Sequence, residues 1–295
     1  MSKEEILLAI SIPVYIVFIV SEIVIGKKKN KDNYNFKDSL VSIILGIFGG
    51  MLDLGLKFIT LGVLNWCNQH AIVEPNLLSK FPIAAWFIVF IGQDFCFYWL
   101  HRSEHYNRVL WAVHSNHHSS EKYNFTVALR SSVLQPFYRF VFYIPIALIG
   151  FDGLSIMFIY AVNQFYQFFL HTELIGKFPK WYESIFVTPS HHRVHHASNI
   201  KYLDKNMGQV LIIWDKLFGT FQEEDEKPKY GLTSSLETYN PFRVVFNEWI
   251  KIRKDLSKPG PIKQKLSYLI KAPGWSHDGS TKTSNELRSE LSKEN

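Results

Sequence analysis

The apolar residues of this chain gather in five long blocks that are separated by shorter polar segments. The blocks run from Ile6 to Ile25, Leu40 to Trp66, Ile83 to Leu100, Phe137 to Phe151 and Leu154 to Leu170. The first three approach or exceed the roughly 20 apolar residues that an α-helix needs to cross a bilayer. Only Asp152 and Gly153 separate the last two blocks, which therefore predict a tight hairpin that does not cross fully. The pattern predicts an all-α, integral membrane helical bundle.

The second block carries two features that bear on its packing. Asp53 and Lys57 are four residues apart and share one helical face, where they could form an ion pair. Gly46 and Gly50 form a GxxxG pattern, which is typical of close contact between membrane helices. We therefore expect this helix to pack closely on a neighbour and to depart from a single straight crossing.

Lysine placement predicts the orientation in the membrane. The run Lys27–Lys29 follows the first block, and cytoplasmic loops are enriched in Lys and Arg. Counting crossings from this run puts His101 and His171, at the ends of the third and fifth blocks, on the cytoplasmic side. Asn76 is then expected on the opposite side from position 190. The net charge of +6 suits an anionic membrane surface rather than nucleic acid.

This count predicts a multi-pass membrane protein with a histidine-rich helical cap, and its active site, on the cytoplasmic side. The membrane would be the inner or plasma membrane in a bacterium and the endoplasmic reticulum in a eukaryote. We expect membrane helices in residues 1–80, a catalytic domain in 81–222 and a polar cytoplasmic tail in 223–295. The part of the tail after Pro261 is rich in Ser, Lys and Glu, so we expect it to be loose.

Ten of the twelve histidines lie between residues 101 and 196 and fall mainly into three boxes. The boxes are HRSEH at 101–105, HSNHH at 114–118 and HHRVHH at 191–196. Residues three and four apart share one face of a helix, so each box presents two or three imidazoles to one point. This spacing predicts a metal site. The only cysteines, Cys67 and Cys96, are too few for a Cys₄ zinc site or an iron–sulfur cluster.

The number of histidines points to two metal ions, because a zinc site takes three or four protein ligands. Imidazole binds zinc, copper, iron and nickel, so ligand type alone does not choose the metal. The apolar surroundings favour an unactivated hydrocarbon as substrate. Zinc has no redox chemistry with which to attack such a C–H bond, so iron is the expected metal.

Further motifs surround the boxes, including Asp94, Tyr98 and Arg102. Longer motifs follow these three residues. They are HSSEKYN at 118–124, ALRSSVLQ at 128–135, HTE at 171–173, TPSHHRVHH at 188–196, DKN at 204–206 and IWDKLFGT at 213–220. With these motifs, residues 93–221 resemble the fatty acid hydroxylase / sterol desaturase superfamily, and its alkylglycerol monooxygenase-like members most. One departure is that Tyr106 stands where those members have a glutamate, whereas here the acid, Glu104, lies inside the first box.

The resemblance implies two iron ions that use O₂ to hydroxylate or desaturate a lipid, which could be a fatty acyl, sterol or ether lipid. Zinc can replace iron in purified protein, since imidazole accepts both. The ligands that the resemblance implies are His101, His105, His114, His117, His118, His192, His195 and His196.

We expect His171 to be a ninth ligand. Asn163, Gln167 and His171 are spaced by four, so they form a polar stripe on an apolar helix. Polar groups inside a membrane span usually face a partner or a cavity, and here either the metal site or helix packing could explain them. The stripe makes Asn163 and Gln167 candidate catalytic residues. His191 points about a quarter-turn away from His192 and stays an undecided ligand.

Carboxylates are expected near the histidines, because neutral imidazoles bring no charge to offset two cations. Asp94 lies two helical turns before His101 on the same face, and Glu104 lies within the first box. These two are the main candidates, with Glu173 and Asp204 as others. Beyond the third box, we expect Asn206, Trp214 and Asp215 to form a structural clamp that returns the cap to the membrane.

The expected partners are the membrane, a lipid substrate and an external electron donor. The sequence contains neither a GxGxxG motif nor a pair of CxxC motifs. Electrons would then come from a reduced protein carrier or a reduced pterin.

Two other functions remain open, a histidine-rich membrane metal-binding or transport protein and a zinc-dependent membrane hydrolase. The clustering of the histidines disfavours the first, and the absence of an HExxH motif disfavours the second.

Overall fold

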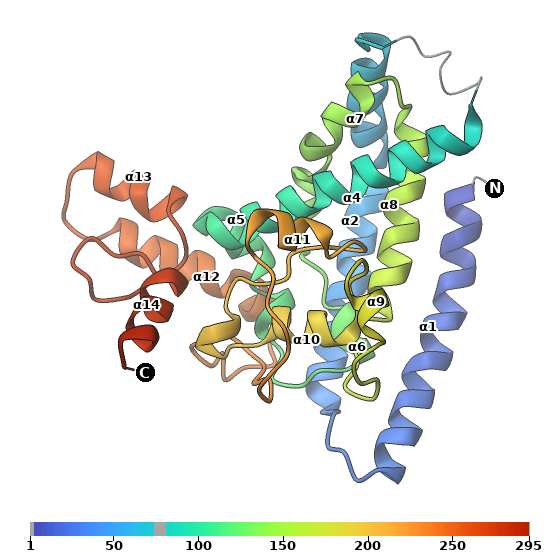
Figure 1. Cartoon of the computed structure of the whole chain (residues 1–295). Coiled ribbons are helices and arrows are strands. Elements are labelled where there is room, and N and C mark those ends of the chain that lie inside the picture. Colours follow the sequence, from blue (N-terminus) through green and yellow to red (C-terminus); the bar gives the residue numbers. More distant parts are fainter. Residues whose placement is uncertain (1–2, 74–80, 295) are drawn as a thin grey trace.

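The computed structural model describes residues 3–73 and 81–294, and within these residues the regular structure is helical apart from two isolated β-bridges (Figure 1). The all-α prediction is therefore confirmed. Asn76, which we used to predict sidedness, lies outside the described residues.

Three helices are long and apolar enough to cross a membrane. They are α1 (Lys3–Lys28), α2 (Phe36–Gln69) and α4 (Pro82–Tyr106). Each corresponds to one of the first three apolar blocks. Many of their large side chains are exposed, such as Phe58 at 85% and Ile83 at 88%. In water such a surface would be unfavourable, whereas lipid tails cover it at no cost in hydrophobic free energy.

The fourth and fifth blocks form short helices. The 3₁₀ helix η3 (Arg139–Tyr143) continues into α7 (Ile144–Leu148), and the chain then turns into α8 (Gly153–Phe168). Sixteen residues are fewer than the roughly 20 that a crossing needs. The turn packs closely on α2, because the Gly153 amide donates to Asn65 Oδ1 at 2.8 Å and a Cβ there would meet that oxygen at 3.0 Å.

Helix α2 packs closely against the segment 128–132 of the cap, at Gly46 and Gly49 rather than through both glycines of the GxxxG pattern. A Cβ on Gly46 would lie 2.7 Å from the Leu129 carbonyl oxygen, whereas one on Gly50 would meet no heavy atom within 4 Å. Asp53 also has a partner outside its own helix. Its carboxylate forms an ion pair with Arg139 of η3, a residue too distant in sequence for helical spacing to reveal.

A cap of short helices and loops covers one end of the long helices. It comprises α5 (Arg108–His114), η1 (His117–Ser119), α6 (Phe125–Ala128), η2 (Gln135–Phe137), α9 (Lys180–Glu183), α10 (Pro189–His196), η4 (Ile200–Tyr202) and α11 (Ile213–Phe218). Two buried acids tie it to the long helices. Glu22 of α1 accepts from the Phe125 amide at 2.8 Å, and Asp38 of α2 pairs with Arg130 at 2.8 Å.

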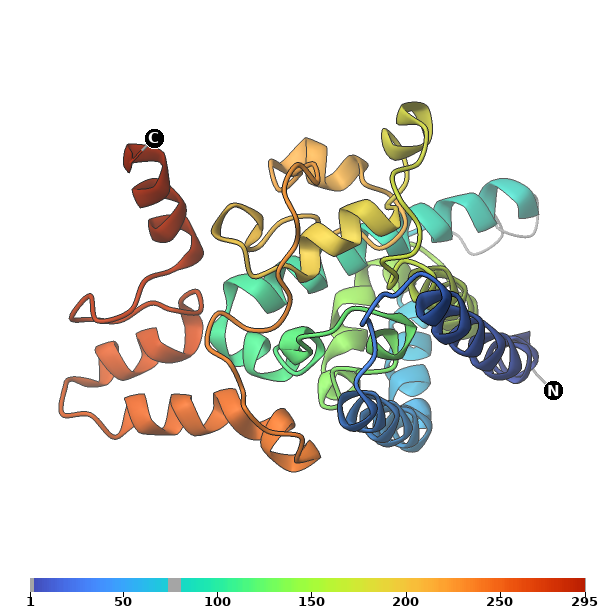
Figure 2. The same cartoon turned by 90° about the horizontal axis from the view of Figure 1, so that it is seen from below.

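The C-terminal segment is helical, and this includes the part after Pro261, which we expected to be loose. It contains α12 (Pro241–Leu256), α13 (Ile262–Ile270) and α14 (Ser284–Glu294). Arg108 of α5 binds Glu248 of α12 at 3.2 Å and Asp255 at 2.7 Å, and apolar side chains such as Ile252 are buried. The composition of this segment is polar because its helices are amphipathic, which a composition argument does not detect. Figure 2 shows these orange-to-red helices on the side of the molecule away from α1.

Candidate metal centre

Two adjacent groups of histidines converge under the cap. In each, one ring nitrogen per histidine lies within 4.8 Å of the others. The first group is His101, His105, His114, His118 and His195, and the second is His117, His171, His192 and His196. All nine histidines that the sequence singled out as ligands therefore lie in these groups, and His171 joins the second. Four of the five first-group imidazoles come from α4, α5 and α10, which the fold brings to one place.

Outward hydrogen bonds fix the protonation of several rings. His101 Nδ1 lies 2.8 Å from the Met207 carbonyl oxygen, His117 Nδ1 2.9 Å from that of Arg130, and His195 Nδ1 2.9 Å from that of Lys205. His171 Nδ1 lies 3.0 Å from the Gln167 carbonyl oxygen. A carbonyl only accepts, so in each neutral ring Nδ1 carries the proton and Nε2 keeps its lone pair. This is the arrangement that a metal ligand needs.

The inward nitrogens fit cations. His101 Nε2 and His114 Nε2 are 3.0 Å apart, and His114 Nε2 is 3.1 Å from His118 Nε2. Lone pairs held so close repel one another unless a cation lies among them. The Nε2 atoms of His105, His195 and His196 are buried and have no hydrogen-bond partner. A buried polar atom without a partner is costly, and metal coordination removes that cost. The residues of both groups thus fit one metal ion each.

Burial keeps the imidazoles outside α4 neutral. It lowers the pKa of His117 to about 4 and holds the pKa of His114, His118, His195 and His196 well below 6.5. The neighbouring imidazoles act in the same direction, because one protonated ring disfavours the next. At pH 7 the rings are therefore in the neutral form that binds a metal.

Glu104 lies behind the first group and contacts one of its members. Its Oε2 is 3.3 Å from His114 Nδ1, while its Oε1 accepts from Gln135 at 2.8 Å and from the Tyr138 hydroxyl at 2.6 Å. Asp204 contacts His105 in the same way, with Oδ1 3.1 Å from Nδ1. Both carboxylates can orient an imidazole and place negative charge next to a cation. The partners Gln135 and Tyr138 had no signal in the histidine spacing.

Asp94 occupies a different place from the one that the sequence suggested. It accepts from the Val210 amide at 2.9 Å, the Leu211 amide at 3.2 Å and Trp214 Nε1 at 2.8 Å. The spacing from His101 predicted which face of α4 carries Asp94. The loop after the third box lies against that face, so Asp94 contacts the loop rather than a histidine. Asp94 thus anchors the loop that carries the Met207 carbonyl. These bonds favour a positioning role for Asp94 over the catalytic role expected from the sequence.

Asn163 and Gln167 lie one turn apart on α8 and have different surroundings. Asn163 is buried and donates to Gln93 of α4, so it joins two helices. Gln167 lines a cavity that also touches the histidines. The polar stripe therefore has two uses, helix packing at Asn163 and cavity lining at Gln167.

The remaining candidates lie around the third box. His191 belongs to neither group, and its Nδ1 lies 3.3 Å from the Thr188 amide, as a cap of α10. Asp215 accepts from the amides of Met207 at 2.7 Å and Gly208 at 2.8 Å. Asn206 donates to the carbonyls of His191 and Gln222. These bonds hold the segments around residues 191, 207 and 222 to one another, within the cap. Glu173 contacts the Tyr230 hydroxyl at 3.2 Å.

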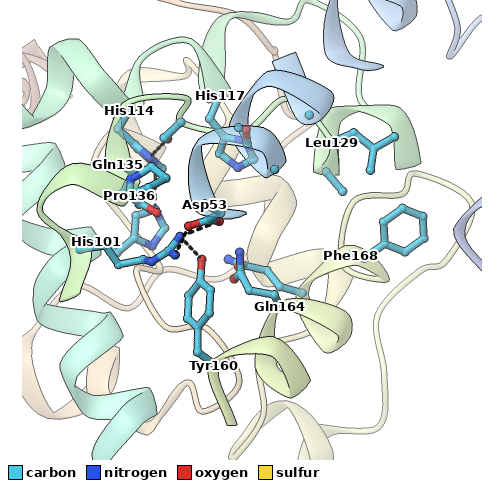
Figure 3. A pocket seen from close by; sticks show the side chains of 18 of the residues that line it. Asp53, His101, His114, His117, Leu129, Gln135, Pro136, Tyr160, Gln164 and Phe168 are labelled. Atoms are coloured by element: carbon cyan, nitrogen blue, oxygen red, sulfur yellow. Dashed lines mark hydrogen bonds and ion pairs between the residues drawn. The ribbon is translucent and has the colours of Figure 1, made fainter. Parts of the chain in front are cut away.

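A cavity of about 270 Å³ meets both histidine groups. His101 and His114 of the first group and His117 and His171 of the second lie on its wall. The rest of the wall comes from α1, α2, α4, α8 and the segment 128–139, so the cavity lies among the apolar helices (Figure 3). A second cavity, of about 760 Å³, touches His105, His118, His195 and His196 and is bordered by residues of the C-terminal segment.

Comparison with known proteins identifies the segment that holds this centre. Residues 86–220, which include all nine histidines, match the family model described as fatty acid hydroxylase. Residues 86–220 form a domain of the fatty acid hydroxylase family. Helices α1, α2 and α12–α14 lie outside the matched segment.

Several curated proteins are similar to the chain over more than this segment. Alkylglycerol monooxygenase of Homo sapiens is 40% identical over 270 residues, which cover 89% of this chain and 58% of that protein. The protein of the same name from Caenorhabditis elegans is 34% identical over 284 residues, covering 88% and 53%. Ornithine lipid hydroxylase OlsE of Rhizobium tropici is 30% identical over 158 residues, covering 52% and 46%. The chain thus spans little more than half of these monooxygenases, and no solved structure matches it.

We predict that the purified protein binds two metal ions per chain and that His171→Ala lowers both metal content and turnover. Removing one of four nitrogens weakens one site and leaves the other in place. Elemental analysis of detergent-solubilised protein measures this directly. His70→Ala is the control, because that imidazole lies at the exposed end of α2 on the Trp66 carbonyl. Full metal content and normal turnover in His171→Ala would make His171 a packing residue.

We also predict that Asp94→Ala lowers the melting temperature. The variant leaves two buried amides and an indole N–H unpaired, and hydrogen bonds to charged groups each contribute about 1.5–3 kcal/mol. Metal content should fall in parallel, because the loop that holds His101 is released. Thermal unfolding in detergent, followed with elemental analysis, checks both effects. Unchanged stability and metal content with abolished turnover would return Asp94 to the catalytic residues.

Proposed function

We propose that this protein is a membrane-bound, non-haem di-iron oxygenase that hydroxylates or desaturates a lipid with O₂. The observation that carries the proposal is the meeting of two neutral histidine groups with a cavity that lies among apolar helices. An all-imidazole set suits a redox metal, and the cavity suits a hydrocarbon substrate. The similarity to a lipid hydroxylase and to alkylglycerol monooxygenases supports the same reaction class.

The nine histidines would hold the iron ions, five around one and four around the other. When bound, the iron supplies the activation of O₂ that oxidation of an unactivated C–H bond requires. The chain's own residues position the substrate. Phe97, Leu129 and Phe168 give the cavity apolar walls that exclude water from the reacting carbon. Ser132 Oγ holds His114 from behind at 2.9 Å from its Nδ1, and Glu104 Oε2 lies 3.3 Å from the same atom.

The two other functions have less support. A transport protein would place its histidines along a path across the helices, whereas the two groups here lie side by side. A zinc hydrolase needs three ligands and an open position, and five and four histidines exceed that number. The proposed electron donor is external, a protein carrier or a reduced pterin. From the run Lys27–Lys29 we propose that the site faces the cytoplasm.

Oxygen incorporation tests the function. Cells that express the wild-type protein or a His192→Ala/His196→Ala variant are grown under ¹⁸O₂, and their lipids are profiled by mass spectrometry. An alkylglycerol is the first added substrate, because the relatives are named for it. We expect ¹⁸O in a hydroxylated lipid product, or a new double bond, only with the wild-type protein. Identical lipid profiles from both strains would contradict the proposal.

We predict that Gly50→Leu blocks the substrate cavity. Gly50 lines it, and a Cβ there meets no heavy atom within 4 Å, so the new side chain enters open space rather than the protein. Turnover should fall at least about tenfold, which corresponds to about 1.4 kcal/mol in activation free energy. Metal content and melting temperature should hold, since Leu favours a helix more than Gly does.

Gly55→Leu is the matched control for this prediction. Gly55 lies on the same helix and a Cβ there also meets no heavy atom within 4 Å, but it is not among the cavity's lining residues. Its turnover should equal that of the wild type. Equal losses in both variants would indicate an effect on α2 rather than on the cavity.

A further inference from the structure

A charged cluster lines the cavity at the level of the apolar helices. Asp53 lies near the middle of α2 and pairs with Arg139 of η3. Arg139 Nη1 also donates to the Tyr160 hydroxyl of α8 at 2.8 Å, and its guanidinium stacks 4.3 Å above the Tyr160 ring. Figure 3 shows Asp53 and Tyr160 joined through these bonds inside the pocket.

Charges at this depth need a reason. An ionised group in the hydrocarbon region is expensive and usually marks a substrate path or a binding site. If the pair only joined α2 to η3, an apolar contact of the same size would serve as well or better. The exposure of the two partners also differs. The Arg139 side chain is 6% exposed, but that of Asp53 is 42% exposed, so part of the carboxylate remains available to a ligand.

The cluster shares its cavity with the metal centre. Asp53, Arg139 and Tyr160 line the same space as His101 and His171. A volume of about 270 Å³ lies just below the roughly 300–1,000 Å³ of sites that hold a whole small molecule. It can hold the polar end of a lipid and the first atoms of its chain, while the rest of the chain lies outside among the exposed apolar side chains.

We propose that Asp53, Arg139 and Tyr160 bind the polar end of the lipid and select an uncharged, hydroxyl-bearing headgroup over a phosphate. This inference rests on the proposed function. The carboxylate accepts hydrogen bonds from hydroxyl groups, whereas it repels a phosphate. Arg139 does not offset that repulsion, because Asp53 already neutralises its charge and its Nη atoms are engaged by Asp53 and Tyr160. Binding there places the carbons next to the headgroup toward the histidines.

Headgroup preference is measured with two probes that differ only in the phosphate, a 1-O-alkylglycerol and its 3-phosphate. Binding to metal-loaded protein in detergent is measured without O₂, and turnover is measured separately with O₂. The wild type should bind the alkylglycerol at least about tenfold more tightly. Asp53→Asn should reduce this ratio to about one or invert it, because Arg139 is left with uncompensated charge. Asp53→Glu, which keeps the carboxylate, should retain the preference.

Asp32→Asn is the matched control, since it makes the same charge change at a side chain that is 89% exposed and pairs with Lys122. It should keep the wild-type ratio. If Asp53→Asn does not fold, Tyr160→Phe takes its place. Loss of the hydroxyl should raise the KM for the alkylglycerol at unchanged metal content.

The outcomes separate this inference from the proposed reaction. An unchanged binding ratio in Asp53→Asn, or an unchanged KM in Tyr160→Phe, overturns the headgroup site even if the lipid is oxidised. A ratio that shifts as expected in a protein that oxidises neither probe supports the headgroup site and counts against the reaction.

Discussion

Neutral imidazoles that face one another in a dry interior need cations between them. The Nε2 atoms of His101, His114 and His118 approach to about 3 Å while the opposite nitrogen of His101 is held by a carbonyl. Burial keeps the rings outside α4 unprotonated, so protons do not relieve the repulsion at neutral pH. Hydrogen bonds from the surrounding residues hold these rings in place, as they do around a metal centre.

That support comes mainly from backbone carbonyls and a few acids. Met207, Arg130, Lys205 and Gln167 offer carbonyl oxygens, and these carbonyls must themselves be fixed. Asp94 and Asp215 fix the loop that includes Met207 by accepting from its amides and from Trp214. The carboxylates near the histidines therefore have two different kinds of contact. Glu104 and Asp204 each lie within 3.3 Å of an imidazole Nδ1, and Asp94 and Asp215 hold the loop behind the histidines.

The cavity joins the polar centre to the apolar exterior. Its walls combine glycines of α2, aromatic side chains of α4 and α8 and one charge pair, so it presents hydrocarbon surface near the histidines and hydrogen-bonding groups beside them. Small residues serve two purposes on α2. Gly46 allows close backbone packing against Leu129, and Gly50 leaves open space. The proposed function needs both a rigid metal site and room for a lipid chain.

Spacing along the chain determined the local features, because a helix repeats every 3.6 residues. It identified the three membrane-length helices, the histidine boxes and the stripe that brings His171 to the centre. It did not reveal which face meets which partner, because tertiary packing decides that. Asp53 therefore forms an ion pair with Arg139 of η3, and Asp94 accepts hydrogen bonds from the loop at 210–214 rather than contacting a histidine. The division of nine histidines into groups of five and four, and the folding of a polar C-terminus into amphipathic helices, likewise depend on contacts between residues far apart in sequence.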